Sequence, residues 1–536
     1  MKVTLKGIKD RDAFDKAGIA LPDYDVARVQ ATSRNNPVWL HFGAGNIFRG
    51  YIASLQHDLL SSRSQTSGII TLSTHDGAEV DRVLSSHDRL TLETTVLRDG
   101  TLNLRVTAAI ANSYKLNGSS PADEYDVRAL ATRQSIQMIS YTITEKGYVI
   151  RDIKGNFLPE IKKDIESGPV APGHTVSWTA ALLWERWQAG AAPVAMVSFD
   201  NCSENGNLLR DAVLTIAREW ESRGFVNQAF IRYLSDEDSV TFPNTMIDRI
   251  TPYPDRDIAA RLTAMGIEDM EVYTSKKGAH MAPFVNMEKS RYLVIEDKFP
   301  NGRPQLEKVG VLFTTARGVQ LFERMKVSAC LNPLQTALAL YGCIFGYEHI
   351  SDAMNDRQLI NLIRRLGYEE CLRVVDSPMI VTPREYLNEI FKERLTNRAL
   401  PDTPARIATD TSQKIRMRFG YTISAYQKRG YALTSLVALP LALAGWLRYL
   451  MAIDDNGHTM KISDDPMLSE LSRRMSEIIF TRPDSVERTL RPLLSNETVF
   501  GQNLYEAGIG QTVENLFKEM ITGPGAVRAT LIRYMG

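Results

Sequence analysis

A glutamate, a lysine and an asparagine within one short stretch are the side chains best placed to do chemistry in this sequence. Residues 321–345, LFERMKVSACLNPLQTALALYGCIF, contain Glu323, Lys326 and Asn332. A lysine withdrawn from water loses its proton more readily and can then act as a general base. A lysine on the surface, which is the usual place for this residue type, would have no such role. The interpretation therefore depends on the elements that position these residues.

A buried helix is predicted to follow Asn332. Proline disfavours helical geometry in the residue before it and is tolerated in the first helical turn, so Asn332, which precedes Pro333, is expected to be the N-cap. Lys326, six residues earlier, is expected on a separately wound segment at the mouth of this helix. Apolar residues then recur at helical spacing: Leu334, Ala337, Leu338 and Tyr341.

The composition is that of a globular chain with two or three domains. Of its 536 residues, 44% are hydrophobic and 24% are charged. The 63 basic and 63 acidic residues cancel, so no overall field favours nucleic acid or an anionic membrane. The four cysteines have neither CxxC pairing nor metal-ligand spacing, which argues against a disulfide framework or a structural zinc site and fits a reducing cytoplasm.

Two segments bear on targeting and on membranes. The N-terminus, MKVTLKGIKDRDAF, is too charged to contain the apolar centre of a signal peptide. The apolar run at 431–447 is only 17 residues long and contains Pro440 and Gly445. We therefore predict a buried core helix there rather than a membrane span, and a cytoplasmic protein.

A glycine-rich motif follows the first predicted strand, at 38–42. In GAGNIFRG, Gly43 and Gly45 fill two positions of the dinucleotide fingerprint, where glycine permits a tight turn and a close approach of the backbone to a pyrophosphate. Phe48 stands at the third glycine position. A turn without ligand is the alternative. The motif predicts a cofactor site made by Phe42, Gly43, Ala44, Gly45, Asn46, Ile47 and Phe48.

The strand predicted at 68–77 ends where an acidic residue is expected to bind the ribose of NAD. Ser73, Thr74 and His75 occupy that position, and Asp76 follows slightly late. Asp76 is the candidate ribose ligand, and NAD is the expected cofactor, with NADP left open.

The remaining patterns set the domain organisation. We predict a hairpin within 84–111, a strand at 135–144, a helix at 174–190 and a strand at 194–199 that ends at Asp200 and Asn201. Alternation of strands and helices indicates a mainly parallel sheet, whereas long helical patterns dominate after about residue 320. The expected fold is an α/β, doubly wound Rossmann-type domain followed by an all-α domain. The expected parts are a lead-in segment 1–36, a dinucleotide-binding domain 37–310 and a helical domain 311–536.

Eight motifs, in this order, resemble the long-chain mannitol dehydrogenase family, and within it the hexuronate branch is most similar. The resemblance covers roughly residues 38–536 and leaves 1–36 without a functional account. The motifs are GAGNIFRG (43–50), SYTITEKGY (140–148), FDNCSENG (199–206), TFPNTMIDRITP (241–252), VIEDKFPNGRP (294–304), FERMK (322–326), NRALPDTPARIATDTSQKI (397–415) and LALAGWLRYLMAIDDNG (441–457).

The resemblance implies a zinc-independent, nicotinamide-dependent dehydrogenase without a metal ligand set. Lys326 matches the family's catalytic lysine. Asn201 and Asn332 match two asparagines that bind the reacting oxygen as a small oxyanion hole. Glu323 matches a glutamate that connects the lysine to solvent, and Glu145 of the TEKGY motif is a second candidate for the proton path.

Two cations match the part of the family site that reaches the rest of the substrate. Arg406 and Lys414 are expected to bind the polyol chain or a carboxylate, and the arginine suits a two-pronged contact. Alternatively, both are ion-pair partners of the nearby Asp402 and Asp410.

The sequence departs from the family pattern K-x-x-x-x-N-G-S-H at one place. One residue is inserted between Lys326 and Asn332, Pro333 replaces glycine, and Gln335 stands at the histidine position. Glutamine forms hydrogen bonds but cannot change its charge near neutral pH. Either a π-bulge or a loop absorbs the insertion and keeps Lys326 in place, or Lys326 points elsewhere.

The leading expectation is an NAD(P)-dependent oxidoreductase that interconverts a sugar acid, similar to mannonate and fructuronate, or a polyol with its keto form. Alternatives are a 2-dehydrogenase of neutral polyols such as mannitol or arabinitol, and a nucleotide- and sugar-binding protein whose chemistry is weakened by Gln335. The expected partner is a small molecule, with no nucleic acid and no membrane, and the expected state is a monomer or simple homo-oligomer.

Overall fold

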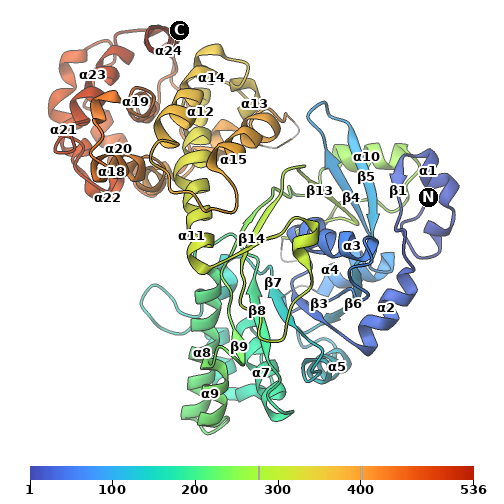
Figure 1. Cartoon of the computed structure of the whole chain (residues 1–536). Coiled ribbons are helices and arrows are strands. Elements are labelled where there is room, and N and C mark those ends of the chain that lie inside the picture. The colour runs from blue at the N-terminus through green and yellow to red at the C-terminus, as the bar shows by residue number, and fades with distance from the viewer. Residues whose placement is uncertain (76, 276–277, 399, 401) are drawn as a thin grey trace. The chain divides into compact units, whose positions relative to one another are not determined.

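The chain divides into two compact units in a computed structural model that describes residues 1–75, 77–275, 278–398, 400 and 402–536 (Figure 1). The first unit comprises Met1–Leu97 and Thr101–Gln320, and the second comprises Arg98–Gly100 and Leu321–Gly536. The N-terminal segment therefore belongs to the first unit.

A parallel sheet with the order β6-β3-β2-β7-β8-β9 forms the centre of the first unit. The strand order reverses at the junction of β2 and β7, where doubly wound folds bind their ligands. The predicted α/β class is confirmed. The strands are β2 (Trp39–Phe42), β3 (Ile69–Ser73), β6 (Ile110–Lys115), β7 (Met138–Tyr141), β8 (Val194–Ser198) and β9 (Val240–Thr241).

Helices and further strands cover the two faces of this sheet. Because side chains alternate along a strand, Leu40 and Phe42 enter one core while Trp39 enters the other. The core around Trp39 is closed by α3 (Ala53–Ser61), β10 (Thr245–Asp248) and β14 (Tyr292–Glu296). The core around Leu40 is closed by α5 (Pro121–Ala131), α6 (Pro159–Ser167), α7 (Thr175–Gln188), α8 (Asn205–Ser222) and α9 (Gln228–Ser235).

Smaller sheets complete the first unit. The predicted hairpin forms as an antiparallel pair, β4 (Thr91–Val96) and β5 (Leu102–Thr107), but its expected end at 110–111 instead begins β6 of the main sheet. The pair continues into a sheet with the order β1-β5-β4-β13. The other elements of this unit are β1 (Ile19–Ala20), β13 (Phe284–Met287), β15 (Leu312–Thr314) beside β14, the pair β11 (Tyr273–Thr274) and β12 (His280–Met281), and α10 (Arg256–Ala264).

The N-terminal segment packs on the β1-β5-β4-β13 sheet. It forms α1 (Arg11–Lys16) and α2 (Val26–Asn35), and Val3, Phe14 and Ile19 join the core of that sheet. The segment is thus an integral part of the first unit rather than a free extension.

Helices make up the second unit, where the described residues show only one isolated β-bridge, between Ile453 and Thr459. The predicted all-helical character is confirmed. The helices are α11 (Ala316–Met325, which begins before Leu321), α12 (Asn332–Phe345), α13 (Ile350–Ala353), α14 (Arg357–Arg364), α15 (Pro383–Glu389), α16 (Pro404–Ile407), α17 (Thr411–Ile415), α18 (Tyr421–Lys428), α19 (Ala438–Leu450), α20 (Leu468–Met475), α21 (Glu487–Leu494), α22 (Glu497–Phe500), α23 (Gly510–Met520) and α24 (Ala526–Met535).

Two buried helices, α12 and α19, form the centre of the second unit. Tyr341 on α12 donates its hydroxyl to the carbonyl of Leu441 at 2.7 Å. A Cβ added at Gly445 of α19 would lie 2.6 Å from the Tyr341 ring, so the missing side chain permits this close approach. Glu370 accepts hydrogen bonds from the first backbone N–H groups of α19, which stabilises the helix start.

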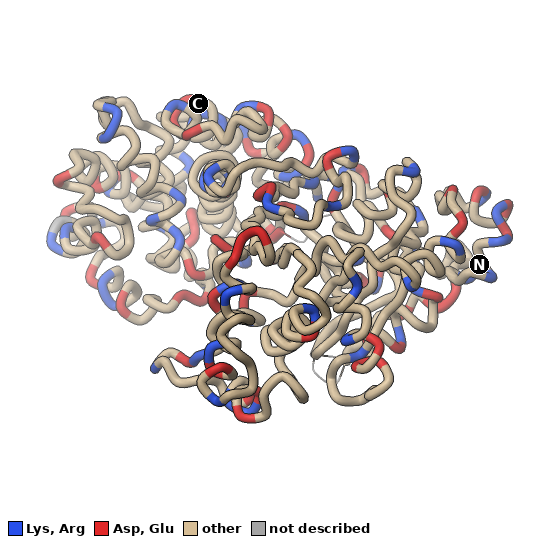
Figure 2. The backbone as a smooth tube through the Cα atoms, turned by 60° about the horizontal axis from the view of Figure 1, so that its bottom comes forward, with Lys and Arg blue, Asp and Glu red and all other residues tan. Residues whose placement is uncertain are grey.

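The apolar run predicted as a core helix at 431–447 is α-helical only from Ala438, where α19 begins. Every residue of α19 is buried, whereas Tyr431, Ala432, Thr434 and Ser435 are exposed. The continuous helical run Ala316–Phe345 is long and apolar enough to cross a membrane, but 78% of its apolar window is buried inside the protein, as is usual for a core helix. Acidic and basic residues are interspersed along the chain in both units (Figure 2).

Candidate active site

The turn after β2 has the form that a pyrophosphate requires. Gly43 has a φ of +117°, and a Cβ added there would lie 2.5 Å from the carbonyl oxygen of Thr142, so only glycine fits. Gly45 faces open space, since the nearest atom to an added Cβ is Oε1 of Glu79 at 4.0 Å. A helix begins at Asn46, and the N–H groups of a helix start bind anions. These residues fit the cofactor that the sequence predicts.

A buried arginine supports this turn. Arg49 donates to the carbonyls of Ala44 at 3.1 Å and Ala282 at 2.8 Å, and to Oδ1 of Asn46 at 2.9 Å. Burial lowers the pKa of Arg49, while the charge of Glu79 opposes that shift. In the sequence, only its place in the glycine motif pointed to Arg49, and it was not among the predicted site residues.

At the third glycine position of the usual fingerprint, this chain has Phe48. Phe48 lies in a π-helical turn, η2 (Phe48–Ile52), and stacks on His41 with ring centroids 4.0 Å apart. Burial keeps the pKa of His41 well below its usual value. The close helix–strand packing that the third glycine normally permits occurs instead at Gly50, where an added Cβ would lie 2.9 Å from Cγ2 of Val285.

The other predicted cofactor residues lie around the same turn. Phe42 and Ala44 are buried, whereas Asn46 and Ile47 are half-buried. Asp76, the candidate ribose ligand, lies outside the described residues.

Two predicted site residues stand at the carboxyl ends of paired strands. Asn201 follows β8, and Glu145 opens the 3-10 turn Glu145–Tyr148 after β7. Both side chains are exposed. They are therefore accessible at the sheet edge where α/β folds bind substrates.

A buried carboxylate, which the sequence analysis did not single out as a site residue, shapes this edge. Asp200 accepts hydrogen bonds from the backbone N–H of Ile143 at 3.0 Å and of Thr144 at 2.9 Å, and from the Tyr148 hydroxyl at 2.5 Å. Thr144 has φ 64° and ψ 163°, a conformation that normally requires glycine. Burial raises the pKa of Asp200 against these hydrogen bonds. The carboxylate thus holds the turn that presents Glu145.

The segment that carries Lys326 contains a π-helical turn. After α11, η8 (Lys326–Cys330) is wound as a π-helix, and the N–H of Leu331 donates to the carbonyl of Lys326 at 3.1 Å. A π turn therefore lies where the sequence predicted that an inserted residue could be absorbed. Lys326 is buried, at 8% exposure, and Glu323 lies three residues earlier, on the same helix face.

The predicted N-cap is wrong by one residue. Leu331, with φ −123° and ψ −66°, is the N-cap, and Asn332 is the first residue of α12. The bend that ends the π turn falls at Leu331, so the helix has already begun at the residue before Pro333. Asn332 is half-buried, and its carbonyl accepts the hydroxyl of Thr336 at 2.7 Å.

Gln335, at the family's histidine position, lies next to an ion pair. Its Nε2 donates to Oδ2 of Asp402 at 3.4 Å, and the other oxygen of Asp402 pairs with Arg406. The Arg406 side chain is 60% exposed. Of the two sequence interpretations of Arg406, the ion pair with Asp402 is therefore observed.

Lys414 does not form the corresponding pair. Its Nζ donates to the carbonyl of Thr409 at 2.6 Å, and among the described residues no ion pair joins it to Asp410. Burial and the charge of Arg418 lower the pKa of Lys414, against the opposing charges of Asp410 and Asp465.

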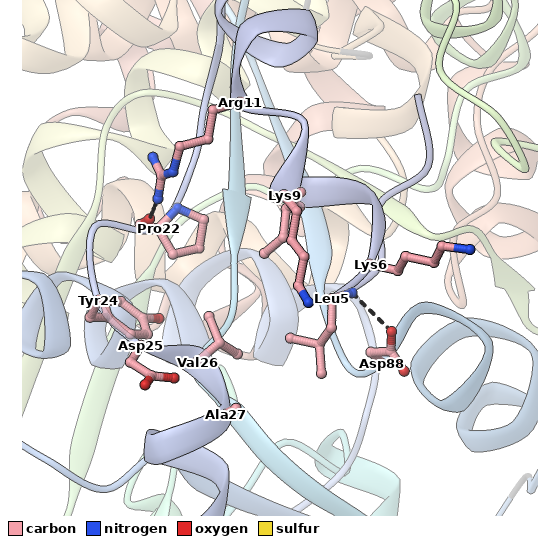
Figure 3. Close-up of a pocket in the computed structure, with 11 residues that line it drawn as sticks. Leu5, Lys6, Lys9, Arg11, Pro22, Tyr24, Asp25, Val26, Ala27 and Asp88 are labelled. Carbon is pink, nitrogen blue, oxygen red and sulfur yellow. Dashed lines mark hydrogen bonds between the residues drawn. The ribbon is translucent and has the colours of Figure 1, made fainter.

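A pocket of about 580 Å³ lies in the N-terminal segment of the first unit (Figure 3). The backbone N–H of Leu5 donates to the Asp88 carboxylate in its wall at 2.9 Å. Lys6, Lys9 and Arg11 also line it. No residue that the sequence predicts to bind or react lines this pocket, so it is separate from the candidate active site.

Two family models match the chain. The mannitol dehydrogenase Rossmann domain matches residues 38–308, and the mannitol dehydrogenase C-terminal domain matches residues 318–521. A D-mannonate oxidoreductase of Thermotoga maritima is 45% identical over 100% of this chain and 99% of that protein.

Solved structures show the same fold. A D-sorbitol dehydrogenase in substrate-free form superposes with a TM-score of 0.80 at 24% identity, covering 96% of this chain and 98% of that one. A Pseudomonas fluorescens mannitol 2-dehydrogenase, in a ternary complex with NAD and D-mannitol, superposes with a TM-score of 0.68 at 25% identity, covering 99% of both chains.

Proposed function

The chain belongs to the mannitol dehydrogenase family, and on this premise we propose that it is an NAD-dependent oxidoreductase that interconverts a sugar acid of the mannonate kind with its keto form. The full-length identity of 45% to a D-mannonate oxidoreductase carries the choice of a sugar acid. The substrate is a small molecule, and the protein acts as a monomer or simple homo-oligomer in the cytoplasm.

The residues around Gly45 are proposed to hold the cofactor. The open space at Gly45 admits a pyrophosphate, and the start of the following helix supplies N–H donors. Asp76 would bind the ribose. NAD held by these residues would supply the hydride acceptor for the carbinol carbon of the substrate.

Lys326 is proposed as the general base that takes the proton of the reacting hydroxyl. Lys326 differs from the surface lysines because it is buried and lies on the π turn. Glu323, on the same helix face, would pass the proton to solvent, and Glu145 would provide a second path.

The two asparagines are proposed to bind the reacting oxygen. Asn332 begins α12 and Asn201 follows β8, and the amide of each would donate to that oxygen as negative charge develops on it. Gln335 would retain the hydrogen bonding of the family's histidine, without its change of charge. Arg406 and Lys414 would contact the remainder of the substrate.

Nicotinamide absorbance tests the reaction directly. Fructuronate and tagaturonate are offered with NADH or NADPH, and mannonate, altronate, mannitol and arabinitol with the oxidised cofactors. Turnover of one hexuronate and its reduced acid, with NAD preferred, is the expected result. A preference for mannitol would favour the neutral-polyol alternative. Absence of turnover with NAD binding intact would refute the enzyme proposal in favour of a binding protein.

Replacing Lys326 with alanine tests the proposed base. General base catalysis contributes about 10²–10⁴-fold, so Lys326→Ala should lower kcat by that factor while the Kd for NAD stays within about twofold. Lys392→Ala, which removes a lysine side chain that is 79% exposed in the same unit, is the matched control and should behave as wild type. Joint loss of NAD binding and turnover would assign Lys326 a structural role instead.

A further inference from the structure

Arg418 is a half-buried cation without a carboxylate partner among the described residues. It lies in η11 (Arg416–Gly420), a π-helical segment that continues α17. Its Nη1 donates to Oγ1 of Thr336, which is the one hydrogen bond seen for this side chain in the described part of the chain. Burial lowers the pKa of Arg418 to about 10, with no opposing charge. Partial withdrawal of this charge from water is unfavourable, and pairing with an anion would offset the cost.

Three fully buried arginines, Arg49, Arg186 and Arg448, are differently arranged. Arg186 donates to the carbonyls of Ala131, Arg133, Ile136, Ala192 and Pro193. Arg448 donates to the carbonyls of Met520, Ile453 and Asp454. Arg49 likewise donates to the carbonyls of Ala44 and Ala282 and to Oδ1 of Asn46. These guanidiniums stabilise the fold, whereas most donors of Arg418 are left for another partner.

The position of Arg418 connects it to the segment proposed to bind substrate. Thr336, its partner, follows Gln335 on α12 and donates in turn to the carbonyl of Asn332. Arg418 therefore meets the first turn of the helix that begins at Asn332. Its side chain is only partly enclosed, so its free edge is accessible to a small molecule.

Lys414 adds a second positive charge at this place. It lies four residues before Arg418 on the continuous helix, which puts both side chains on one face. The charge of Arg418 lowers the pKa of Lys414, so the two cations are close enough to repel each other. Asp410 and Asp465 favour the charged lysine, but neither forms an ion pair with Lys414 or Arg418 in the described residues.

Arg406 is less suited to receive an anion. Its charge is already paired with Asp402, which also accepts from Gln335. A new carboxylate would have to displace Asp402 from a place where it is itself buried.

We propose that Arg418, assisted by Lys414, binds the carboxylate of the substrate and thereby selects a sugar acid over a neutral polyol. Thr336 fixes one arm of the guanidinium, and the remaining N–H groups form a fork that matches the two oxygens of a carboxylate. This inference rests on the proposed function and adds to it the group that recognises the acid.

Dead-end binding to the NADH-saturated protein tests this inference without turnover. D-mannonate and D-mannitol are titrated calorimetrically into wild type, Arg418→Met and Arg418→Lys. Loss of charge-assisted hydrogen bonds should weaken mannonate binding by about 10- to 100-fold in Arg418→Met, and by less in Arg418→Lys. Binding of mannitol and of NADH should be unchanged. Arg473→Met, which truncates a side chain that is 66% exposed in the same unit, is the matched control.

The outcomes separate this inference from the proposed function. The role of Arg418 is overturned if Arg418→Met binds mannonate and mannitol equally more weakly, or if its affinity for neither ligand changes. Wild-type protein that binds mannitol but not mannonate also overturns it. Wild-type protein that binds mannonate through Arg418 but never turns it over supports the carboxylate site while refuting the proposed reaction. If Arg418→Met does not fold, two milder variants replace it: Arg418→Lys, and Thr336→Val, which keeps the arginine charge but removes the hydroxyl that holds it. Each should bind mannonate more weakly than wild type, by a smaller factor, and should bind mannitol as wild type does.

Discussion

Replacing Gly43 and Gly45 separately with alanine should separate folding from cofactor binding. At Gly43 an alanine would adopt a φ of +117° and place its Cβ 2.5 Å from the Thr142 carbonyl oxygen. Backbone strain of about 1–3 kcal/mol and overpacking of about 1–3 kcal/mol together give a loss of about 2–6 kcal/mol in the free energy of unfolding. For a unit of this size that corresponds to a fall in Tm of roughly 3–9 °C.

At Gly45 the same substitution should leave the fold intact. This residue has no positive φ, and the nearest atom to an added Cβ is 4.0 Å away. The methyl group would occupy the space proposed for the pyrophosphate. Loss of hydrogen bonds between backbone N–H groups and a charged ligand should raise the Kd for NAD by about 10- to 100-fold.

Two measurements on each variant suffice. Thermal unfolding without ligand reports stability, and calorimetric titration with NAD reports affinity. Gly18→Ala is the matched control for strain alone, because Gly18 has a φ of +69° and no atom within 4 Å of an added Cβ. NAD binding by Gly45→Ala with wild-type affinity would refute the placement of the pyrophosphate. A loss of Tm in Gly45→Ala equal to that in Gly43→Ala would refute the steric reasoning.

Two further predictions concern stability. Burial, and secondarily the charge of Arg105, lowers the pKa of His57 from 6.5 to about 4, so the folded state disfavours its protonation. Stability should fall by about 3 kcal/mol as the pH drops from about 6.5 to about 4, and urea unfolding of His57→Gln, but not of the exposed control His458→Gln, should lack this part of the pH dependence. Glu370 accepts from backbone N–H groups at the start of α19 through both carboxylate oxygens, all at 2.8 Å. Glu370→Gln should cost about 2–4 kcal/mol in urea unfolding, whereas a loss no larger than that of the exposed neighbour Glu369→Gln would contradict the capping role.

The strands of the central sheet were predictable from sequence because buried parallel strands are short apolar runs bounded by turn residues. The runs at 38–42 and 194–199 became β2 and β8 within a residue or two. The glycine motif predicted the turn after β2, and the extra residue after Lys326 suggested a π turn or a loop. Both could be recognised because they change the spacing of residues in the chain. The helix start at Asn332 was misplaced by one residue, because the bend at Leu331 depends on the π turn before it.

The charged side chains that support the candidate site could not be predicted from the sequence. Arg49 reaches the carbonyl of Ala282, 233 residues away, and Arg418 reaches Thr336, 82 residues away. Asp200 acts through the backbone of Thr144, 56 residues earlier. Such side chains look like ordinary surface charges in the sequence, since their burial is decided by segments that meet only in the folded protein.

The π turn at Lys326–Cys330 bears on how a change in chain length at this place would affect the core. In a regular α-helix one inserted residue would rotate everything after it by about 100°, and Tyr341 would leave its contact with α19. A π turn contains one residue more than an α turn, so a residue inserted within Lys326–Cys330 would leave the contact of Tyr341 with α19 in register. A change of length within this turn is therefore expected to alter the geometry between Lys326 and Asn332 while the packed interior of the second unit keeps its contacts.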